Sequence, residues 1–122
     1  MARLLRTVVC SYQLGELPTS WLIVFHRLER ALQRAGYRVW VRLAPLERLP
    51  AEPFEILVVP TELRQAAEAS GTGAEVIGLD PPSAAAAIEA FLARFGPEGD
   101  LSAEALEPDE PVIARYRGLM PL

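Results

Sequence analysis

The chain has 122 residues, 51% of them hydrophobic, and a formal net charge of −4. A chain of this length can bury one hydrophobic core, and no apolar run approaches the roughly 20 residues that a membrane-spanning helix needs. A single cysteine, Cys10, excludes an internal disulfide. We therefore expect a cytoplasmic protein without a signal peptide and without direct membrane insertion.

The charges are distributed unevenly along the chain. Residues 1–97 hold ten Arg and ten acidic residues, whereas residues 98–122 hold six acidic residues and two Arg. All 12 basic residues are Arg; they form no basic stripe, and the few aromatic residues do not alternate with them. This pattern predicts no nucleic-acid partner.

The first half of the chain predicts a strand, a loop, a helix and a second strand. The Leu/Val-rich segment 4–10 is typical of a buried strand. Thr19 or Ser20 can cap the following helix, whose apolar residues recur at helical spacing, and Gly36 suits the position after its end. Segment 37–43 alternates apolar and polar residues, which indicates a strand near a sheet edge.

The second half continues the alternation of strands and helices. After a Pro-broken connection with one turn of helix, the predicted elements are a buried strand at 54–60, a short helix at 62–70 capped by Thr61, a strand at 75–80 and a helix at 84–96 capped by Ser83.

This order predicts an α/β three-layer sandwich with a four-stranded parallel sheet, flavodoxin-like in layout. Right-handed crossovers favour the strand order second, first, third, fourth. We expect one α/β domain over residues 1–97. Residues 98–122 are predicted to be an acidic, exposed linker and a C-terminal extension, which lies on its own domain or forms a homodimer contact.

Open parallel sheets bind ligands beyond the carboxyl ends of their strands, where the strand order reverses. That point lies between the first and third predicted strands, so the loop 10–20 is expected to face residues 60–63. A thiolate or phosphoryl group at Cys10 would be stabilised by free amides at the helix N-terminus. The candidate anion-binding residues are Ser11, Gln13, Gly15, Thr19, Ser20 and Thr61.

Each candidate also has a purely structural interpretation. Cys10 can be a small apolar residue at the end of a buried strand, and Thr19, Ser20 and Thr61 can be simple caps. His26 is predicted to be a solvent-exposed residue on a helix face shared with Glu29. One Cys and one His are too few for a metal cluster, so we expect neither a metal nor another cofactor.

With these features together, the chain resembles the IIB component of bacterial sugar phosphotransferase systems. The resemblance rests on a first strand ending in Cys10, a Gly-containing loop, the Thr19–Ser20 pair, and the segments "GYRVWV" and "FEILVVPTEL". It covers roughly residues 4–96 and is nearest to the lactose/cellobiose-like or galactitol/ascorbate-like types.

The resemblance implies that Cys10 accepts a phosphoryl group from a phosphorylated IIA protein. The group would pass to a sugar carried by the membrane component IIC. Residues 11–20 would form the phosphate-binding loop, and Pro60 with Thr61 a second loop beside it. In this chain the first loop is longer than in the family and contains the acidic Glu16.

Two other functions stay open. The chain can be a non-catalytic IIB-like or flavodoxin-like binding or regulatory module, acting through dimerisation or small-anion binding, as Glu16 and the additional C-terminal segment suggest. It can also bind a nucleotide or flavin, although the loop is poor in Thr, Ser and Gly.

Overall fold

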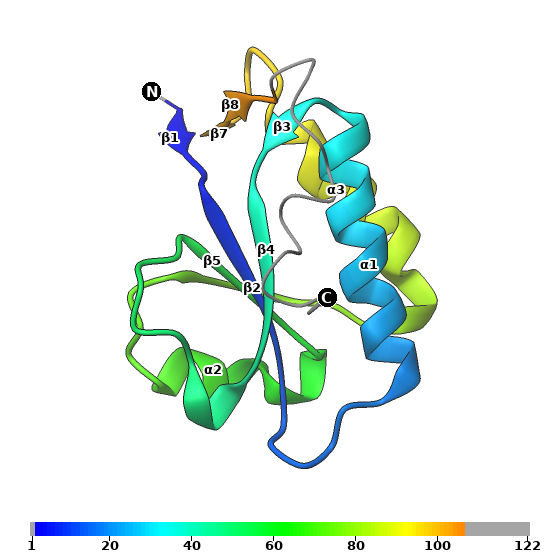
Figure 1. Ribbon diagram of the computed structural model, residues 1–122, viewed down its shortest axis with the longest axis vertical. Coiled ribbons are helices and arrows are strands. Elements are labelled where there is room, and N and C mark those ends of the chain that lie inside the picture. The colour runs from blue at the N-terminus through cyan, green and yellow to red at the C-terminus, as the bar shows by residue number, and fades with distance from the viewer. Residues whose placement is uncertain (1, 107–122) are drawn as a thin grey trace, which may run out of the picture.

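The computed structural model describes residues 2–106, which form a mixed α/β fold around one central sheet (Figure 1). Four parallel strands make this sheet in the order β4-β2-β5-β6. In chain order they are β2 (Thr7–Tyr12), β4 (Trp40–Pro45), β5 (Ile56–Val59) and β6 (Glu75–Gly78). The predicted parallel sheet and its strand order, in which the first predicted strand lies between the second and third, are confirmed.

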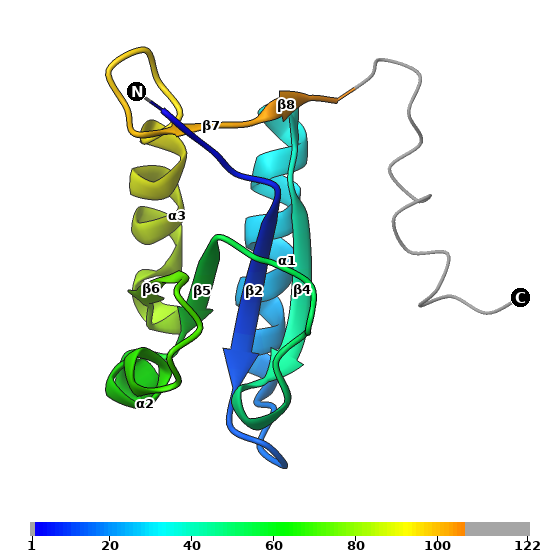
Figure 2. The same cartoon turned by 90° about the vertical axis from the view of Figure 1, so that its left-hand side faces the viewer.

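Helices lie on both faces of this sheet (Figures 1 and 2). α1 (Thr19–Arg34) and α3 (Ala84–Ala93) cover one face and bury the main core. The short α2 (Arg64–Ala69) covers part of the other face over a smaller apolar cluster. The fully buried Val9, Leu57 and Val59 belong to this second cluster. Because neighbouring side chains on a strand point to opposite faces, each central strand contributes to both cores.

The α1 helix forms where the apolar spacing predicted it. Trp21, Phe25, Leu28 and Leu32 are buried against the sheet. The helix ends as expected, because Ala35 is the C-cap and the following Gly36 has a φ of 83°, a conformation that glycine adopts without strain.

Three short 3₁₀ turns lie in the connections after the strands. They are η1 (Leu46–Arg48), η2 (Thr61–Leu63) and η3 (Pro81–Ser83). The turn η1 confirms the single helical turn predicted in the connection that crosses from β4 to β5. The turns η2 and η3 lead directly into α2 and α3.

Four two-residue strands extend the fold at the amino ends of the central strands. The parallel pair is β1 (Arg3–Leu4) with β7 (Leu101–Ser102), and the antiparallel pair is β3 (Tyr37–Arg38) with β8 (Glu104–Ala105). Figure 2 shows β7 and β8 crossing this end of the molecule. The predicted strand 4–10 is therefore divided into β1 and a later β2, which continues to Tyr12.

Residues 98–106 pack against the domain. Leu101 is only 1% exposed and belongs to the main core, whereas Glu98, Asp100, Glu104 and Ala105 are exposed, so the predicted exposed linker is anchored in the core at one residue. The amide of Leu106 donates to the carbonyl of Gly36 at 2.9 Å. The predicted C-terminal extension beyond residue 106 lies outside the described residues.

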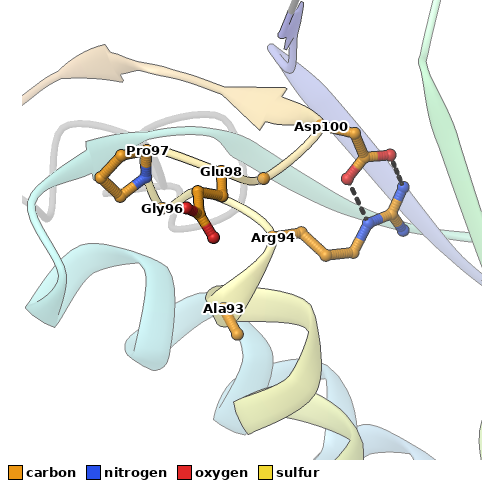
Figure 3. Close-up of a pocket in the computed structure, with 7 residues that line it drawn as sticks. Ala93, Arg94, Gly96, Pro97, Glu98 and Asp100 are labelled. Carbon is orange, nitrogen blue, oxygen red and sulfur yellow. Dashed lines mark hydrogen bonds and ion pairs between the residues drawn. The ribbon is translucent and has the colours of Figure 1, made fainter.

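Arg94 holds this segment in place through several ion pairs, of which Figure 3 shows the pair with Asp100. Its guanidinium donates two hydrogen bonds to Asp100, at 2.6 and 2.9 Å, and two to Glu75, at 2.7 and 2.9 Å. Glu75 also pairs with Arg3. The side chain of Arg94 therefore connects the end of α3 with β6, β1 and the residue before β7.

Candidate functional site

The loop between β2 and α1 extends beyond the carboxyl ends of the strands, at the lower end of Figures 1 and 2. It begins with a tight turn in which the amide of Glu16 donates to the carbonyl of Gln13 at 2.9 Å. Gly15 has a φ of 83° in this turn, which explains a glycine there. The loop thus leaves the sheet as a folded projection.

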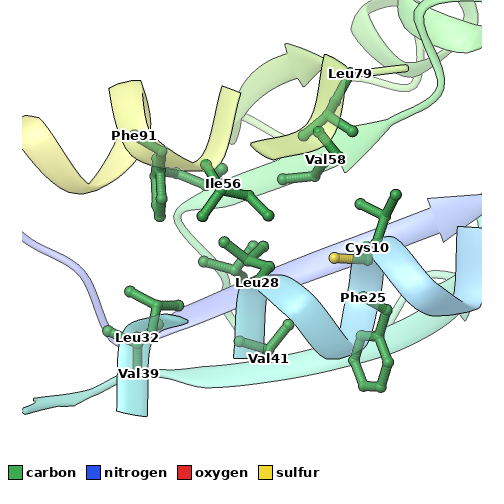
Figure 4. Close-up of a cluster of buried hydrophobic side chains, with 14 of the residues drawn as sticks. Cys10, Phe25, Leu28, Leu32, Val39, Val41, Ile56, Val58, Leu79 and Phe91 are labelled. Carbon is green, nitrogen blue, oxygen red and sulfur yellow. The ribbon is translucent and has the colours of Figure 1, made fainter. Parts of the chain in front are cut away.

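Cys10 does not lie in this loop. It is the fourth residue of β2, two residues before the strand ends, and its exposed fraction is 0%. Figure 4 shows its side chain among Phe25, Leu28 and Val58, between the sheet and α1. This position matches the interpretation of Cys10 as a small apolar residue of the core.

Burial also changes the acidity of this thiol. Loss of hydration, with a smaller contribution from the negative charge of Glu29, raises the pKa of Cys10 to about 12. The nucleophilic form of cysteine is the thiolate, which forms at neutral pH where cations or helix amides lower the pKa. The surroundings of Cys10 have the opposite effect, so its thiol stays protonated and covered.

Ser11 points away from Cys10. It is fully buried, and its hydroxyl donates a hydrogen bond to the carbonyl of Ala44 at 2.8 Å. Because β2 alternates its side chains between the two faces, Ser11 lies on the side of α2 and Cys10 on the side of α1. The hydroxyl of Ser11 is therefore used to join β2 to β4.

The amide of Leu14, in the same turn as Gln13 and Gly15, already has an acceptor. It donates a hydrogen bond to the Glu47 carboxylate in η1 at 2.9 Å. This carboxylate occupies one of the loop amides that a phosphoryl oxygen would need. Sequence reasoning missed Glu47, because only the parallel pairing of β2 and β4 brings residues 14 and 47 together.

Thr19, Ser20 and Thr61 are exposed at the carboxyl end, but they are not brought together around the thiol. Thr19 and Ser20 are the first two residues of α1; the N-cap of this helix is Pro18, with no side-chain capping bond. Thr61 begins η2 and lies against Gly78 at the end of β6. The capping predicted for these three hydroxyls is therefore wrong: main-chain turns begin both helices.

His26 and Glu29 form a pair on the side of α1. Nδ1 of His26 lies 3.8 Å from a carboxylate oxygen of Glu29, and the His26 side chain is 54% exposed. The predicted exposure of His26 is confirmed. Glu29, which was expected on the same solvated face, is instead buried. Glu29 lies four residues after the buried Phe25 and three residues before the buried Leu32. It therefore shares their face of the helix, which explains its burial.

Several apolar residues in and after this loop are exposed, which was not expected from the sequence. Leu14, Leu17 and Ile23 are 46%, 42% and 48% exposed. Leu17 lies at helical spacing from Trp21, but it precedes Pro18 and the start of α1, so it does not join the buried face of the helix. Among large hydrophobic residues of the described chain, only Leu4 and Trp40 are comparably exposed.

Within residues 2–106, no group of three or more His, Cys, Asp or Glu side chains could hold a metal ion. In the same range, no helix has the length and apolar character of a membrane span.

Comparison with known proteins identifies no relative of this chain. The chain matches no protein-family model and no curated protein sequence.

Proposed function

We propose that the chain is a non-catalytic binding module with a flavodoxin-like layout, in which Cys10 has a structural role. The observation that carries this proposal is the complete burial of Cys10 in the apolar core, with its pKa raised to about 12. A phosphoryl acceptor must reach both a donor protein and a sugar, and neither can touch a thiol that is covered on every side.

The environment of the loop supports the same proposal. An anion after β2 would meet Glu16 in the loop and the Glu47 carboxylate on the amide of Leu14. Both negative charges would oppose a phosphoryl group, since like charges at short range destabilise the ionised form. This also weighs against small-anion binding and against a nucleotide phosphate in the loop.

The competing hypothesis is the IIB-like phosphocarrier, with IIA and IIC partners and transfer through Cys10. The sheet order and the cysteine near the end of the first central strand suit it. It would require β2 to shift or the core to open by local unfolding before the thiol could react. The exposed thiol that such a relay needs in its resting state is missing from the described residues.

Phosphorylation by purified IIA proteins separates the two functions. The protein is incubated with phosphorylated IIA components of the lactose/cellobiose and galactitol/ascorbate types, beside an authentic IIB protein as positive control. Intact-mass analysis at neutral pH then measures phosphorylation. We expect no adduct on this chain. A phosphate adduct that is present in the wild type and lost in Cys10→Ser would overturn the proposal.

A further inference from the structure

An exposed acidic residue lies in the turn that directly follows each of the four central strands. Glu16 follows β2, Glu47 follows β4, Glu62 follows β5 and Asp80 follows β6. Because the strands are parallel, these four residues lie at the same end of the sheet. We refer to them as the acidic rim.

The acidic rim is not neutralised by neighbouring side chains. Among the ion pairs formed within residues 2–106, none includes a member of the rim. Two cations lie close in the sequence: Arg48 in η1, which is exposed, and Arg64 at the start of α2, which pairs with Glu68. The rim therefore keeps a net negative charge.

The amino end of the sheet shows the opposite arrangement. There Glu75 and Asp100 are bound by Arg94, and Glu104 lies 3.7 Å from Arg6. Glu55 accepts hydrogen bonds from the backbone amides of Arg6 and Thr7, at the start of β2. The acids at the amino end are thus paired with arginines or bonded to backbone amides, whereas at the other end only Glu47 has a partner, the amide of Leu14, and no rim acid is paired with a cation within the described residues.

Three of the five exposed large hydrophobic residues of the described chain also lie at the acidic end, whereas Leu4 and Trp40 lie at the amino end. We call Leu14, Leu17 and Ile23 the apolar tip. The tip belongs to the projecting β2–α1 loop and the start of α1, and Glu16 lies between two of its members in the sequence. Exposed apolar residues rimmed by charged ones are typical of protein interaction sites.

We propose that the apolar tip and the acidic rim bind a protein partner with an apolar socket surrounded by Arg or Lys side chains. This inference rests on the proposed function, because a phosphate-handling loop would need the opposite charge. The negative rim repels nucleic acids, phosphorylated ligands and anionic bilayers, whereas complementary charge steers a basic partner towards the tip. Burial of the two leucines then supplies affinity.

The test is a heteronuclear NMR titration of the full chain with two amphipathic helical peptides. Both peptides carry the same leucines, but the polar face is Arg in one and Glu in the other. We expect the Arg peptide to shift amides of the β2–α1 loop and of the turns after β4, β5 and β6, and to bind more weakly at higher salt. We expect the Glu peptide to produce no such shifts.

Matched variants assign the binding to the proposed residues. Leu17→Ser should weaken binding of the Arg peptide by about tenfold, whereas Leu4→Ser, at the other end of the sheet, should not. Glu16→Gln should weaken it by about two- to fivefold, and the exposed Glu89→Gln on α3 should not. All four substitutions lie at exposed positions, so thermal unfolding should stay close to that of the wild type.

Three results would overturn the inference. The first is a set of shifts distributed over the whole surface, and the second is equal binding of the Glu peptide. The third is a concentration-dependent shift of the same loop without peptide, which would show that the tip binds a second copy of the chain. The proposed function is tested separately by the Cys10 adduct: no adduct together with no peptide binding removes only this inference.

Discussion

The amide of Leu14 donates a hydrogen bond to the Glu47 carboxylate at 2.9 Å, which joins the loop after β2 to the turn after β4. This contact closes over the place where a phosphate was expected. Hydrogen bonds from a backbone amide to a charged acceptor stabilise by about 1.5–3 kcal/mol when they are shielded, and by less at an exposed site such as this one.

Glu47→Gln should therefore loosen the β2–α1 loop without unfolding the protein. We expect faster hydrogen exchange of the Leu14 amide, because the neutral side chain is a weaker acceptor, and a loss of at most about 1 kcal/mol in the free energy of unfolding. Glu62→Gln is the control, since the Glu62 side chain accepts no hydrogen bond from the β2–α1 loop, which lies within the described residues. Unchanged exchange at Leu14 in the Glu47 variant would show that the contact does not order the loop.

The buried thiol predicts a specific dependence of stability on pH. The pKa of Cys10 is raised from 9.0 to about 12 on folding, so the folded state holds its proton more tightly than the unfolded state. The stabilisation that comes from the neutral thiol is complete below pH 9. It is lost as pH rises from 9 towards 12, by up to about 1.4 kcal/mol per pH unit.

Urea unfolding of the wild type and of Cys10→Ala measures this effect. At neutral pH the alanine variant should be less stable by about 1–2 kcal/mol, because a small cavity replaces the sulfur. Above pH 9 the difference should shrink. The same thiol should react with a disulfide reagent at a rate set by unfolding. A constant difference across this pH range, or immediate reaction in the native state, would show that the thiol is exposed.

Arg94→Met should release residues 98–106 from the domain. The substitution keeps the aliphatic stem but removes four hydrogen bonds, and we expect a loss of about 1–2 kcal/mol in stability. Arg64→Met, which breaks only the exposed pair with Glu68, is the control and should cost less. Equal losses for the two variants would contradict a special role for Arg94.

This network also predicts how stability responds to acid. Hydrogen bonds from Arg94 lower the pKa of Asp100 from 3.8 to about 2 and also lower the pKa of Glu75 from its usual value of 4.5. A carboxyl group whose pKa is lowered on folding stabilises the folded state above its ordinary pKa. This stabilisation is lost as pH falls. The stability difference between the wild type and Arg94→Met should therefore decrease as pH falls from about 5 towards 2.

Gly99→Ala tests the close approach of the chain to the end of α3. A Cβ at this position would overlap the backbone carbonyl of Arg94, so the loop must move. We expect a loss of about 1–3 kcal/mol. Gly96→Ala is the matched control, because its Cβ would lie 3.4 Å from the carbonyl oxygen of Ala93, an ordinary contact. Similar stabilities of the two variants would contradict this packing.

The central sheet was predictable because its elements carry strong local patterns. The apolar runs of β2 and β5, the helical spacing of Trp21, Phe25 and Leu28, and Gly36 at the end of α1 each indicate one structure. The strand order followed from the handedness of the crossovers. The pairing of β1 with β7 and of β3 with β8 has no such local signal, because the partners are far apart in the sequence.

The predicted site could not be derived in the same way. The predicted strand ended at Cys10, which would place this residue at the start of the loop. In the structure β2 continues for two more residues, to Tyr12, and the side chain of Cys10 lies in the core. One residue further, Ser11 points to the opposite face. The Glu47 contact depends on the register between two strands that are far apart in sequence. Such contacts leave no local signal, whereas Leu14 and Leu17, which lie on either side of the turn residue Gly15 in the sequence, do suggest an exposed apolar loop.

The burial of Leu101 has a consequence for how the protein is made. Residues 101–102 pair with residues 3–4, nearly the full length of the described chain away. During synthesis the central sheet and α1 emerge first, but this part of the core stays open until Leu101 has left the ribosome. Pairing of the last described strands therefore completes the core at the end of folding. A nascent chain that is stopped before them exposes apolar surface to chaperones and proteases.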